Sequence, residues 1–273
     1  MAKDFRRVVR KKYSGIAKGD RSCCGGPSTC CGSSSPESVS RKIGYTDVDM
    51  KSVPEGANLG LGCGNPVALA SLKEGETVLD LGAGGGFDCF LAAKRVGKTG
   101  KVIGVDMTPE MLEKARANAT KGKCMNVEFR LGEIENLPVA DGTMDAVISN
   151  CVINLSPDKK RVFEEAYRAL RRGGRLMVSD IVLKKELPSI IKKLEEVYTG
   201  CVAGAMMKGD YLKIIEAAGF GKITIVKEAK YSIEPILDNP KVKAKISRLR
   251  ITKEQMNSAK DSAWSVNIFA EKR

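Results

Sequence analysis

Short apolar runs rich in β-branched residues alternate with helical patterns from Thr77 onward. Such alternation is typical of a parallel sheet wound with helices. The predicted strands are Thr77–Leu81, Lys101–Asp106, Val127–Leu131, Asp145–Ser149, Arg175–Ser179, Lys222–Lys227 and Ser265–Ala270. The last two alternate apolar and polar positions. The pattern therefore predicts an α/β domain.

Apolar positions at helical spacing predict the helices between these strands. The predicted helices are Asp88–Val96, Pro109–Lys121, Asp158–Arg171, Leu187–Tyr198 and Asp210–Ala218. Thr108 is expected to cap the second helix, and Gly173-Gly174 to end the third. The basic stretch 235–263 is expected to be mostly helical, whereas Arg21–Ser38, rich in Gly, Ser, Pro and Cys, is expected to be loop.

Composition and charge restrict the cell compartment and the binding partners that we expect for this protein. No apolar run approaches the ~20 residues of a membrane span, so no membrane partner is expected. Met1–Lys12 is basic and leads into polar sequence without an apolar region, which predicts a cytoplasmic protein rather than a secreted one. The net charge of +13 is concentrated near both ends. Because no aromatic side chains interleave with these clusters, solvated helix faces are favoured over nucleic-acid binding.

The numbers of histidines and cysteines restrict the chemistry that the protein can perform. The chain has no histidine, which excludes an imidazole base and a His-ligated metal. It has nine cysteines, an odd number without an export signal, so a disulfide framework is not expected. Thiols in this number indicate soft-ion binding or redox chemistry.

A glycine loop follows the first predicted strand. Asp80 precedes Gly82, Gly84 and Gly86, and Asp106 ends the next strand about 20 residues later. Glycines allow a sharp turn and close approach of a ligand, and a carboxylate at the second strand end accepts hydrogen bonds from ribose hydroxyls. The spacing admits a dinucleotide or S-adenosylmethionine.

Three cysteines stand in unusual settings. Cys63 lies in a glycine-flanked turn that is expected to expose its thiol, Cys151 follows the fourth strand, and Cys201 lies just past a helix. Thiolates near one ligand crevice favour a soft centre. By contrast, Cys89 and Cys124 are expected to be buried as small apolar side chains.

The remaining four cysteines lie in the Cys-rich leader. The pairs Cys23-Cys24 and Cys30-Cys31 could form a four-thiolate zinc site, but they lack the usual two-residue gap within each pair.

Several segments together carry a resemblance. They are residues 59–66, 80–89, 105–111, 149–155 and 200–205, with Asn-Cys-Val-Ile-Asn-Leu and Gly-Cys-Val-Ala-Gly-Ala the most specific. The chain resembles the arsenite S-adenosylmethionine methyltransferases, within the class I methyltransferase superfamily, from about Val9 to Glu228. It departs in its doubled leader cysteines and in the basic stretch after Glu234, for which the resemblance offers no role.

The resemblance implies a Rossmann-like, seven-stranded, mostly parallel sheet with an antiparallel edge hairpin, preceded by the Cys-rich leader. The expected parts are a Cys-rich segment 1–45, a methyltransferase core 46–232, and a basic helical insertion with the final strand, 233–273. The implied cofactor-binding residues are Asp80, Gly82, Ala83, Gly84, Gly86, Asp106, Met107, Glu133, Ile134 and Asn150. Glu133 is expected to face the adenine amino group, and the backbone at Ile134 its ring edge.

The resemblance also implies a reaction. Cys63, Cys151 and Cys201 would bind As(III), from arsenite or methylarsenite, and methyl groups would pass from S-adenosylmethionine to arsenic. Cys30 or Cys31 would form a redox pair with Cys63, reopened by an external thiol reductant of thioredoxin or glutathione type. The protein is expected to be a monomer. The alternatives are a methyltransferase of another small molecule and a thiol-rich metalloid-binding protein.

Overall fold

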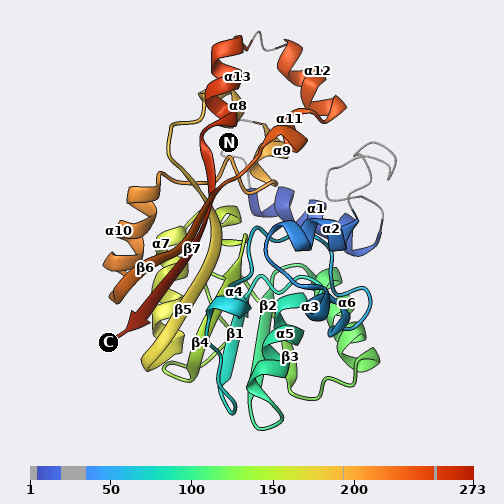
Figure 1. Ribbon diagram of the computed structural model, residues 1–273, viewed down its shortest axis with the longest axis vertical. Coiled ribbons are helices and arrows are strands. Elements are labelled where there is room, and N and C mark those ends of the chain that lie inside the picture. The colour runs from blue at the N-terminus through green and yellow to red at the C-terminus, as the bar shows by residue number, and fades with distance from the viewer. Residues whose placement is uncertain (1–4, 20–34, 193, 249–250) are drawn as a thin grey trace.

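The computed structural model describes residues 5–19, 35–192, 194–248 and 251–273. Its strands are β1 (Thr77–Leu81), β2 (Lys101–Asp106), β3 (Val127–Leu131), β4 (Met144–Asn150), β5 (Leu170–Leu183), β6 (Phe220–Lys230) and β7 (Ala263–Lys272). They form one seven-stranded sheet in the order β3-β2-β1-β4-β5-β7-β6 (Figure 1). Strands β1 to β5 pair in parallel, and β7 is antiparallel to both β5 and β6. The expected fold with an antiparallel edge hairpin is confirmed, while Cys23, Cys24, Cys30 and Cys31 lie outside the described residues.

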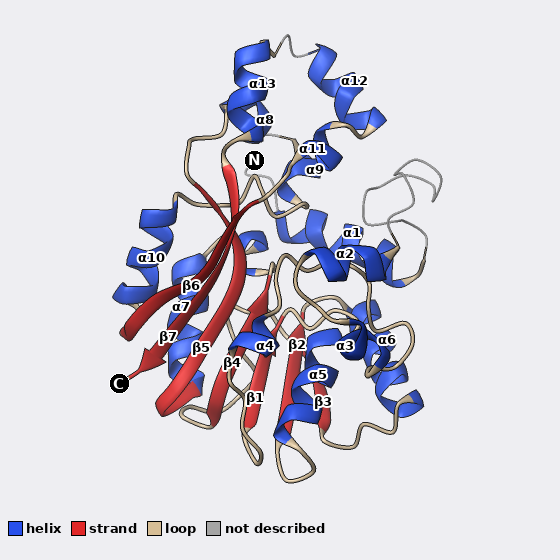
Figure 2. Cartoon of the chain, viewed as in Figure 1, coloured by secondary structure: helices blue, strands red, loops and turns tan. Residues whose placement is uncertain are grey.

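The helices lie on both faces of this sheet and beyond the ends of its strands (Figure 2). Before β1 come α1 (Phe5–Ala17), α2 (Pro36–Lys42), α3 (Asp47–Lys51) and α4 (Pro66–Leu69). Between the strands lie α5 (Phe87–Val96), α6 (Pro109–Lys121), the 3₁₀ helix η1 (Ile153–Leu155), α7 (Lys159–Ala169), α8 (Ser189–Lys192), α9 (Glu195–Tyr198) and α10 (Lys208–Ala217). The stretch between β6 and β7 forms α11 (Glu234–Leu237), α12 (Pro240–Arg248) and α13 (Lys253–Lys260), as expected.

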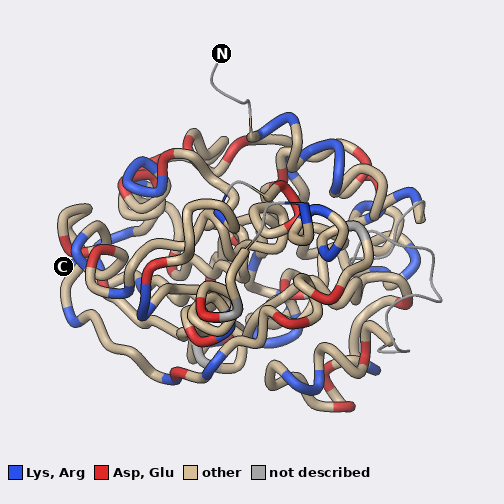
Figure 3. The backbone as a smooth tube through the Cα atoms, turned by 90° about the horizontal axis from the view of Figure 1, so that it is seen from above, with Lys and Arg blue, Asp and Glu red and all other residues tan. Residues whose placement is uncertain are grey.

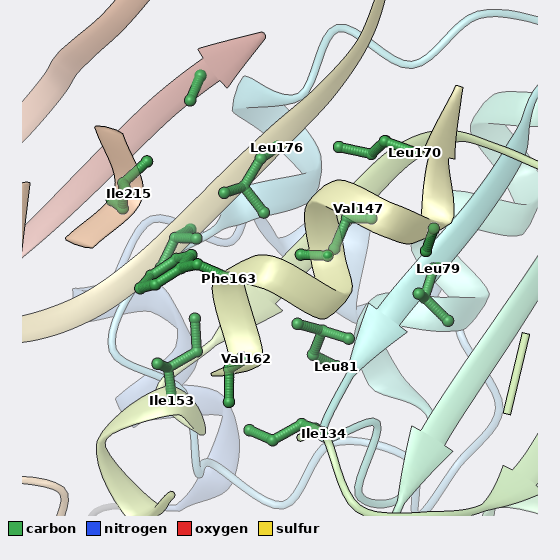
Figure 4. Close-up of a cluster of buried hydrophobic side chains, with 14 of the residues drawn as sticks. Leu79, Leu81, Ile134, Val147, Ile153, Val162, Phe163, Leu170, Leu176 and Ile215 are labelled. Carbon is green, nitrogen blue, oxygen red and sulfur yellow. The ribbon is translucent and has the colours of Figure 1, made fainter. Parts of the chain in front are cut away.

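Alternation along the strands divides the core into two layers. Leu79 and Leu81 point toward α7 and α10, whereas Val78 points toward α5 and α6. Figure 4 shows the first layer, where apolar side chains of the strands meet those of η1, α7 and α10. In that layer Phe163 and Tyr211 pack edge to face with centroids 5.4 Å apart. The packed layers fix the strand ends at which ligands of such sheets bind.

The predicted end of the helix Asp158–Arg171 was wrong. The helix expected to reach Arg171 ends at Ala169, because Leu170 is already extended and pairs with Met144 of β4. Strand β5 is therefore 14 residues long rather than five, and Gly173, with φ 74°, lies inside its irregular start.

The helix predicted over Leu187–Tyr198 is divided into α8 and α9. Leu194 leaves the helical conformation (φ −77°, ψ 123°) and buries its side chain. Thr108 stands at the N-cap position of α6, but its side chain makes no capping hydrogen bond. The four helices before β1 were not predicted at all.

Charges of both signs are mixed around the molecule (Figure 3). Arg6 of the basic helix α1 pairs with Glu135 at 3.2 Å, and Lys18, just after this helix, pairs with Glu110 at 3.1 Å. Some of the basic side chains near the N-terminus therefore form ion pairs within the fold. None of the helices in the described part of the chain combines the length and apolar character needed to cross a bilayer.

Candidate active site

A pocket lies at the carboxyl ends of β1, β2 and β4, the edge at which open α/β sheets bind ligands. Its lining includes eight of the ten predicted cofactor-binding residues: Asp80, Gly82, Ala83, Gly84, Asp106, Met107, Ile134 and Asn150. We refer to it as the cofactor crevice.

The glycine loop forms one wall of this crevice. Gly82 and Gly84 have φ angles of 71° and 51°, a region that glycine adopts without strain. The N–H groups of Gly82 and Ala83 donate to the carbonyl of Val105 at 2.8 and 3.0 Å. The Asp106 carboxylate accepts hydrogen bonds from the Gly84 N–H at 3.0 Å and the Thr108 N–H at 2.8 Å. Asp106 thus holds the loop as well as facing the crevice.

Gly86 and Glu133 do not line the crevice. A Cβ on Gly86 would lie 2.7 Å from Phe90 and 2.8 Å from Phe129, so this glycine allows close packing. The Glu133 carboxylate lies 3.6 Å from the guanidinium groups of both Arg6 and Arg10. The cofactor-binding roles of Gly86 and Glu133 stay predictions.

The crevice is rich in buried carboxylates. Asp80 accepts a hydrogen bond from the Cys89 thiol at 3.1 Å, and Asp88 accepts one from the Tyr45 hydroxyl at 2.5 Å. Burial raises the pKa of Asp80, Asp88 and Asp106, that of Asp88 to about 6. Such an environment suits a cationic ligand, which would relieve the cost of holding these charges together. The sequence reasoning missed Asp88, although it lies one residue into the helix after the glycine loop.

Asn150 connects the crevice to the loop that carries Cys63. Its side-chain NH₂ lies 2.9 Å from the Gly64 carbonyl and 3.0 Å from the Asp88 carboxylate, and its side-chain oxygen accepts the Cys63 N–H at 2.9 Å. A change at this residue would therefore reach both sites.

The thiols of Cys63, Cys151 and Cys201 meet beside the crevice, and we call them the thiol cluster. The Cys151 thiol interacts with those of both Cys63 and Cys201. The Cys201 thiol also donates to the Cys151 carbonyl at 2.8 Å, and the Cys63 thiol to the Ser179 carbonyl at 3.3 Å. Three sulfur atoms from distant segments thus lie near one another, with Cys151 between the other two, and their role as ligands stays a prediction.

Backbone geometry sets two of these cysteines apart. Among the residues that the structure describes, only five non-glycine residues have positive φ, and two of them are Cys151 (62°) and Cys201 (63°). Such conformations cost free energy and persist only where the surroundings impose them. Their occurrence at two neighbouring thiols marks the cluster as a constrained site.

The thiols are buried, and the prediction that Cys63 exposes its thiol was wrong. Cys63 is 3% exposed, because its loop lies against β5 and β7. A Cβ on Gly64 would lie 2.7 Å from Ser179 and Asn267, and the Ser265 hydroxyl donates to the Cys63 carbonyl at 2.8 Å.

Burial has an electrostatic consequence for the cluster. Desolvation raises the pKa of Cys63 to about 11. The interaction with Cys201 lowers the pKa of Cys151, but the interaction with Cys63 and burial outweigh it and raise that pKa well above its ordinary value. The interaction with Cys151 and then burial raise the pKa of Cys201. The free cluster is therefore protonated at neutral pH.

A buried carboxylate, Asp180, lies beside the cluster and was not predicted. One of its oxygens and the sulfurs of Cys63 and Cys151 all lie within 4.8 Å of one another. It accepts hydrogen bonds from Asn154 and the Tyr211 hydroxyl, each at 2.9 Å, and burial raises its pKa to about 7. Its position at the carboxyl end of a predicted strand was the available signal.

The remaining described cysteines stand apart from this cluster. Cys89 is fully buried, as expected, whereas Cys124 is only partly buried and the expectation for it was wrong.

Helix α1 forms the far wall of the crevice. Arg6, Val9 and Tyr13 line it, and the Tyr13 hydroxyl hydrogen-bonds with the Cys201 thiol. Burial and then the nearby acidic groups raise the pKa of Tyr13 well above its ordinary value, so it is a neutral donor. The sequence reasoning missed this helix, although Phe5, Val9, Tyr13 and Ile16 recur at helical spacing.

Comparison with known proteins agrees with this geometry. Residues 72–219 match the methyltransferase domain family. The chain is 51% identical over 229 residues to the arsenite methyltransferase of Halobacterium salinarum, covering 81% of this chain and 59% of that protein. It is 37% identical over 168 residues to the human arsenite methyltransferase, covering 58% of this chain and 44% of that protein. The chain thus spans about half the length of these curated relatives.

A solved structure is similar over a larger share of its own length. The crystal structure of CrArsM, an arsenic(III) S-adenosylmethionine methyltransferase from Chlamydomonas reinhardtii, matches with a TM-score of 0.63 and 32% identity. The match covers 86% of this chain and 73% of CrArsM. The chain therefore belongs to the methyltransferase domain family and, within it, to the arsenite S-adenosylmethionine methyltransferases.

Proposed function

We propose that this protein methylates trivalent arsenic, bound by the thiol cluster, with S-adenosylmethionine bound in the cofactor crevice. The observation that carries the proposal is the meeting of three buried thiols, two of them on strained backbone, beside that crevice. Thiolates select soft centres, and arsenic(III) takes three such ligands. The arsenite methyltransferases among the relatives support the same assignment.

The residues of the crevice fit S-adenosylmethionine. The glycine loop opens onto the first turn of α5, and Asp106 stands at the end of β2. Asp80, Asp88 and Asp106 supply negative charge for a ligand that carries a sulfonium and an ammonium group. When bound, the cofactor supplies an electrophilic methyl group.

The thiol cluster would orient the arsenic. Three sulfur ligands leave the arsenic lone pair free, and fixing it toward the crevice turns a bimolecular displacement into a positioned one. No proton leaves the attacking atom, so a chain without histidine can perform the step. This distinguishes arsenic from hydroxyl or amine substrates, which usually need a base.

The lone pair would form the new As–C bond as the sulfonium S–CH₃ bond breaks and its electron pair stays on the departing S-adenosylhomocysteine, so that arsenic is formally oxidised from the trivalent to the pentavalent state. Two thiolates can return two electrons to arsenic by closing a disulfide. Cys63 with Cys30 or Cys31 is our proposed pair, and an external thiol reductant of thioredoxin or glutathione type would reopen it. Cys30 and Cys31 lie outside the described residues.

The direct test incubates the purified protein with arsenite, labelled S-adenosylmethionine and a dithiol, followed by chromatographic speciation of arsenic. Methylated arsenicals are expected. Absence of any such product from folded protein, with the cofactor bound, would overturn the proposal.

The role of Cys63 needs a separate test, because ligand and redox partner are different functions. Arsenite has three exchangeable positions, whereas monomethylarsenite has two. Cys63→Ser is therefore expected to abolish the first methylation and to spare the second when excess small dithiol replaces the protein reductant. Equal loss of both steps would show that Cys63 shapes the site itself.

A further inference from the structure

The helical segment between β6 and β7 contains the basic stretch to which the sequence assigned no role. Its helices lie beyond the ends of β5, β6 and β7, beside α8 and α9 (Figure 1). Ile233, Leu237, Val242 and Ala259 belong to the same buried cluster as Cys63, Cys151 and Cys201. The segment thus shares its core with the thiols rather than with the main sheet.

Its lysines serve contacts within the fold. Lys243 pairs with Asp238 at 3.1 Å and Lys260 with Glu234 at 3.1 Å, both within the segment, whereas Lys245 pairs with Glu196 of α9 at 2.5 Å. These contacts favour an internal role for the segment over a basic surface for nucleic acid.

Cys201 is the member of the thiol cluster that depends most on external support. Its φ of 63° is strained, and it follows α9, a helix of only four residues that cannot be stable alone. Cys151, by contrast, directly follows β4 and donates its N–H to the Ser179 carbonyl of β5 at 2.8 Å. The central sheet therefore holds one strained cysteine, and something else must hold the other.

Two contacts from the segment reach the turn that carries Cys201. A Cβ on Gly200 would lie 2.7 Å from Cδ1 of Ile236, so the Ile236 side chain lies directly against the backbone before Cys201. The second contact is the ion pair of Lys245 with Glu196, which outweighs burial and lowers the pKa of that carboxyl.

On the opposite side, the Lys12 ammonium lies 3.2 Å from the Thr199 carbonyl and 3.1 Å from its hydroxyl. The turn is thereby held between α1 and the segment formed by α11 and α12.

We propose that α11 and α12 position Cys201 as an arsenic ligand, with Ile236 and Lys245 as positioning residues. The inference rests on the proposed function. Loosening these contacts releases the strained turn and weakens arsenic binding, while the cofactor crevice keeps its own supports from the sheet. The effect is selective for one of the two sites.

The test compares Ile236→Ala and Lys245→Met with the matched control Lys243→Met, because Lys243 lies on the same helix as Lys245 but pairs with Asp238 inside the segment. Arsenite affinity is measured by the near-ultraviolet absorbance of As–S bonds, S-adenosylmethionine affinity by calorimetry, and folding by thermal melting. Arsenite binding is expected to weaken about fivefold to tenfold in both variants, a range typical of coupling between packed elements. Cofactor affinity and the control should match the unaltered protein.

A variant in a second background separates positioning from general destabilisation. In Cys201→Ser, where the positioned ligand is gone, adding Ile236→Ala should leave the residual arsenite affinity unchanged. In the otherwise unaltered protein, the conservative variant Ile236→Leu should retain the arsenite affinity that Ile236→Ala loses. Unchanged arsenite affinity in Ile236→Ala and Lys245→Met would overturn the inference, as would an equal loss of cofactor affinity or a further loss in the Cys201→Ser background. If the unaltered protein methylates arsenite while these variants behave like it, this inference alone fails. If the unaltered protein binds no arsenite, the proposed function fails with it.

Discussion

The cofactor crevice takes most of its residues from the ends of adjacent parallel strands, whereas the thiol cluster is assembled from segments far apart in the chain. Asp80 and Asp106 end or nearly end β1 and β2, which pair directly in the sheet. Cys63, Cys151 and Cys201 come from a loop before β1, the end of β4 and a turn after α9. The strand ends thus form the base of the crevice and α1 its far wall, while the cluster also depends on α11 and α12.

This difference explains why strained backbone conformations occur in the thiol cluster and not in the glycine loop. The crevice meets its need for positive φ with glycine, as at Gly82 and Gly84, which lowers the cost. The thiol cluster cannot do so, because the residue at the strained position must also carry the sulfur. Its two strained cysteines therefore depend on tertiary contacts, and changes in the two regions should have separable effects.

The largest expected effect is at the thiol cluster. Cys151→Ser or Cys201→Ser should reduce turnover to background with arsenite and with methylarsenite, since arsenite then lacks one of its three thiolates and methylarsenite lacks one of the two, Cys151 and Cys201, that orient its lone pair toward the methyl group. Cofactor affinity should stay near that of the unaltered protein. Product speciation and calorimetry measure the two quantities.

Cys89→Ala is the matched control, because Cys89 is equally buried but its thiol faces Asp80 in the crevice. It should keep arsenite affinity and lose only some stability. Loss of arsenite binding in folded Cys89→Ala would show that the ligands are assigned wrongly.

The reverse selectivity is expected at Asp106. Asp106→Asn should weaken S-adenosylmethionine binding by about 1.5–3 kcal/mol, about 10- to 150-fold, the scale of hydrogen bonds to a charged group. Arsenite affinity should be nearly unchanged, because the thiol cluster does not use this carboxylate. Calorimetry measures the affinity of the variant for each ligand. An unchanged affinity for S-adenosylmethionine would show that Asp106 does not contribute to cofactor binding.

The same contrast separates what could be predicted from what could not. The bounds of β1, β2 and β3 follow from local periodicity, and eight of the ten expected cofactor residues line the crevice because they lie at or just after the ends of β1, β2, β3 and β4. Helices α2 and α3 had short-range signals, namely the Ser35-Pro36 start and the capping box of Thr46 with Asp49. These helices are so short that tertiary packing decides whether they form, and no local pattern reports that packing.

The thiol cluster shows the other limit. The three cysteines could be chosen from their settings, but the burial of Cys63 depends on contacts of its loop with Asn150 and Ser179, more than 80 residues away. Asp180 was missed for the same reason, because its closeness to Cys63 exists only in the folded chain. Residue type thus suggested the chemistry that we propose, and the fold supplied its environment.

A smaller effect is expected at Tyr13, which faces both regions. Tyr13→Phe keeps the ring in the crevice but removes the hydroxyl that hydrogen-bonds with Cys201. Arsenite affinity should fall about fivefold to tenfold, the scale of one hydrogen bond, with cofactor affinity retained. Tyr167→Phe is the control, since the Tyr167 ring packs against Phe220 in the core layer of α7 and α10, apart from the thiol cluster. If both variants weaken arsenite binding equally, the Tyr13 hydroxyl has no specific role.

The smallest effect is a pH dependence confined to the cofactor crevice. The pKa of Asp88 is about 6, above the ordinary value, because burial disfavours the charged carboxylate. Ionisation of Asp88 therefore costs the unliganded protein stability, and stability should fall as the pH rises from about 4 to about 6. A cationic ligand reverses the preference, since it binds better to the charged form. S-adenosylmethionine affinity should accordingly fall about fourfold when the pH is lowered from about 7 to about 5.5.

The control ligand is S-adenosylhomocysteine, which lacks the sulfonium charge and should show a weaker dependence over the same range. The control variant is Asp88→Asn, in which the dependence of S-adenosylmethionine binding should disappear, while arsenite affinity at pH about 7 should stay within about twofold because the thiol cluster is held by other contacts. Calorimetric titrations of both ligands across the range measure the slope. A slope that persists in Asp88→Asn would assign the titrating group to another carboxylate of the crevice, and an equal slope for both ligands would show that the sulfonium charge is not what the crevice recognises.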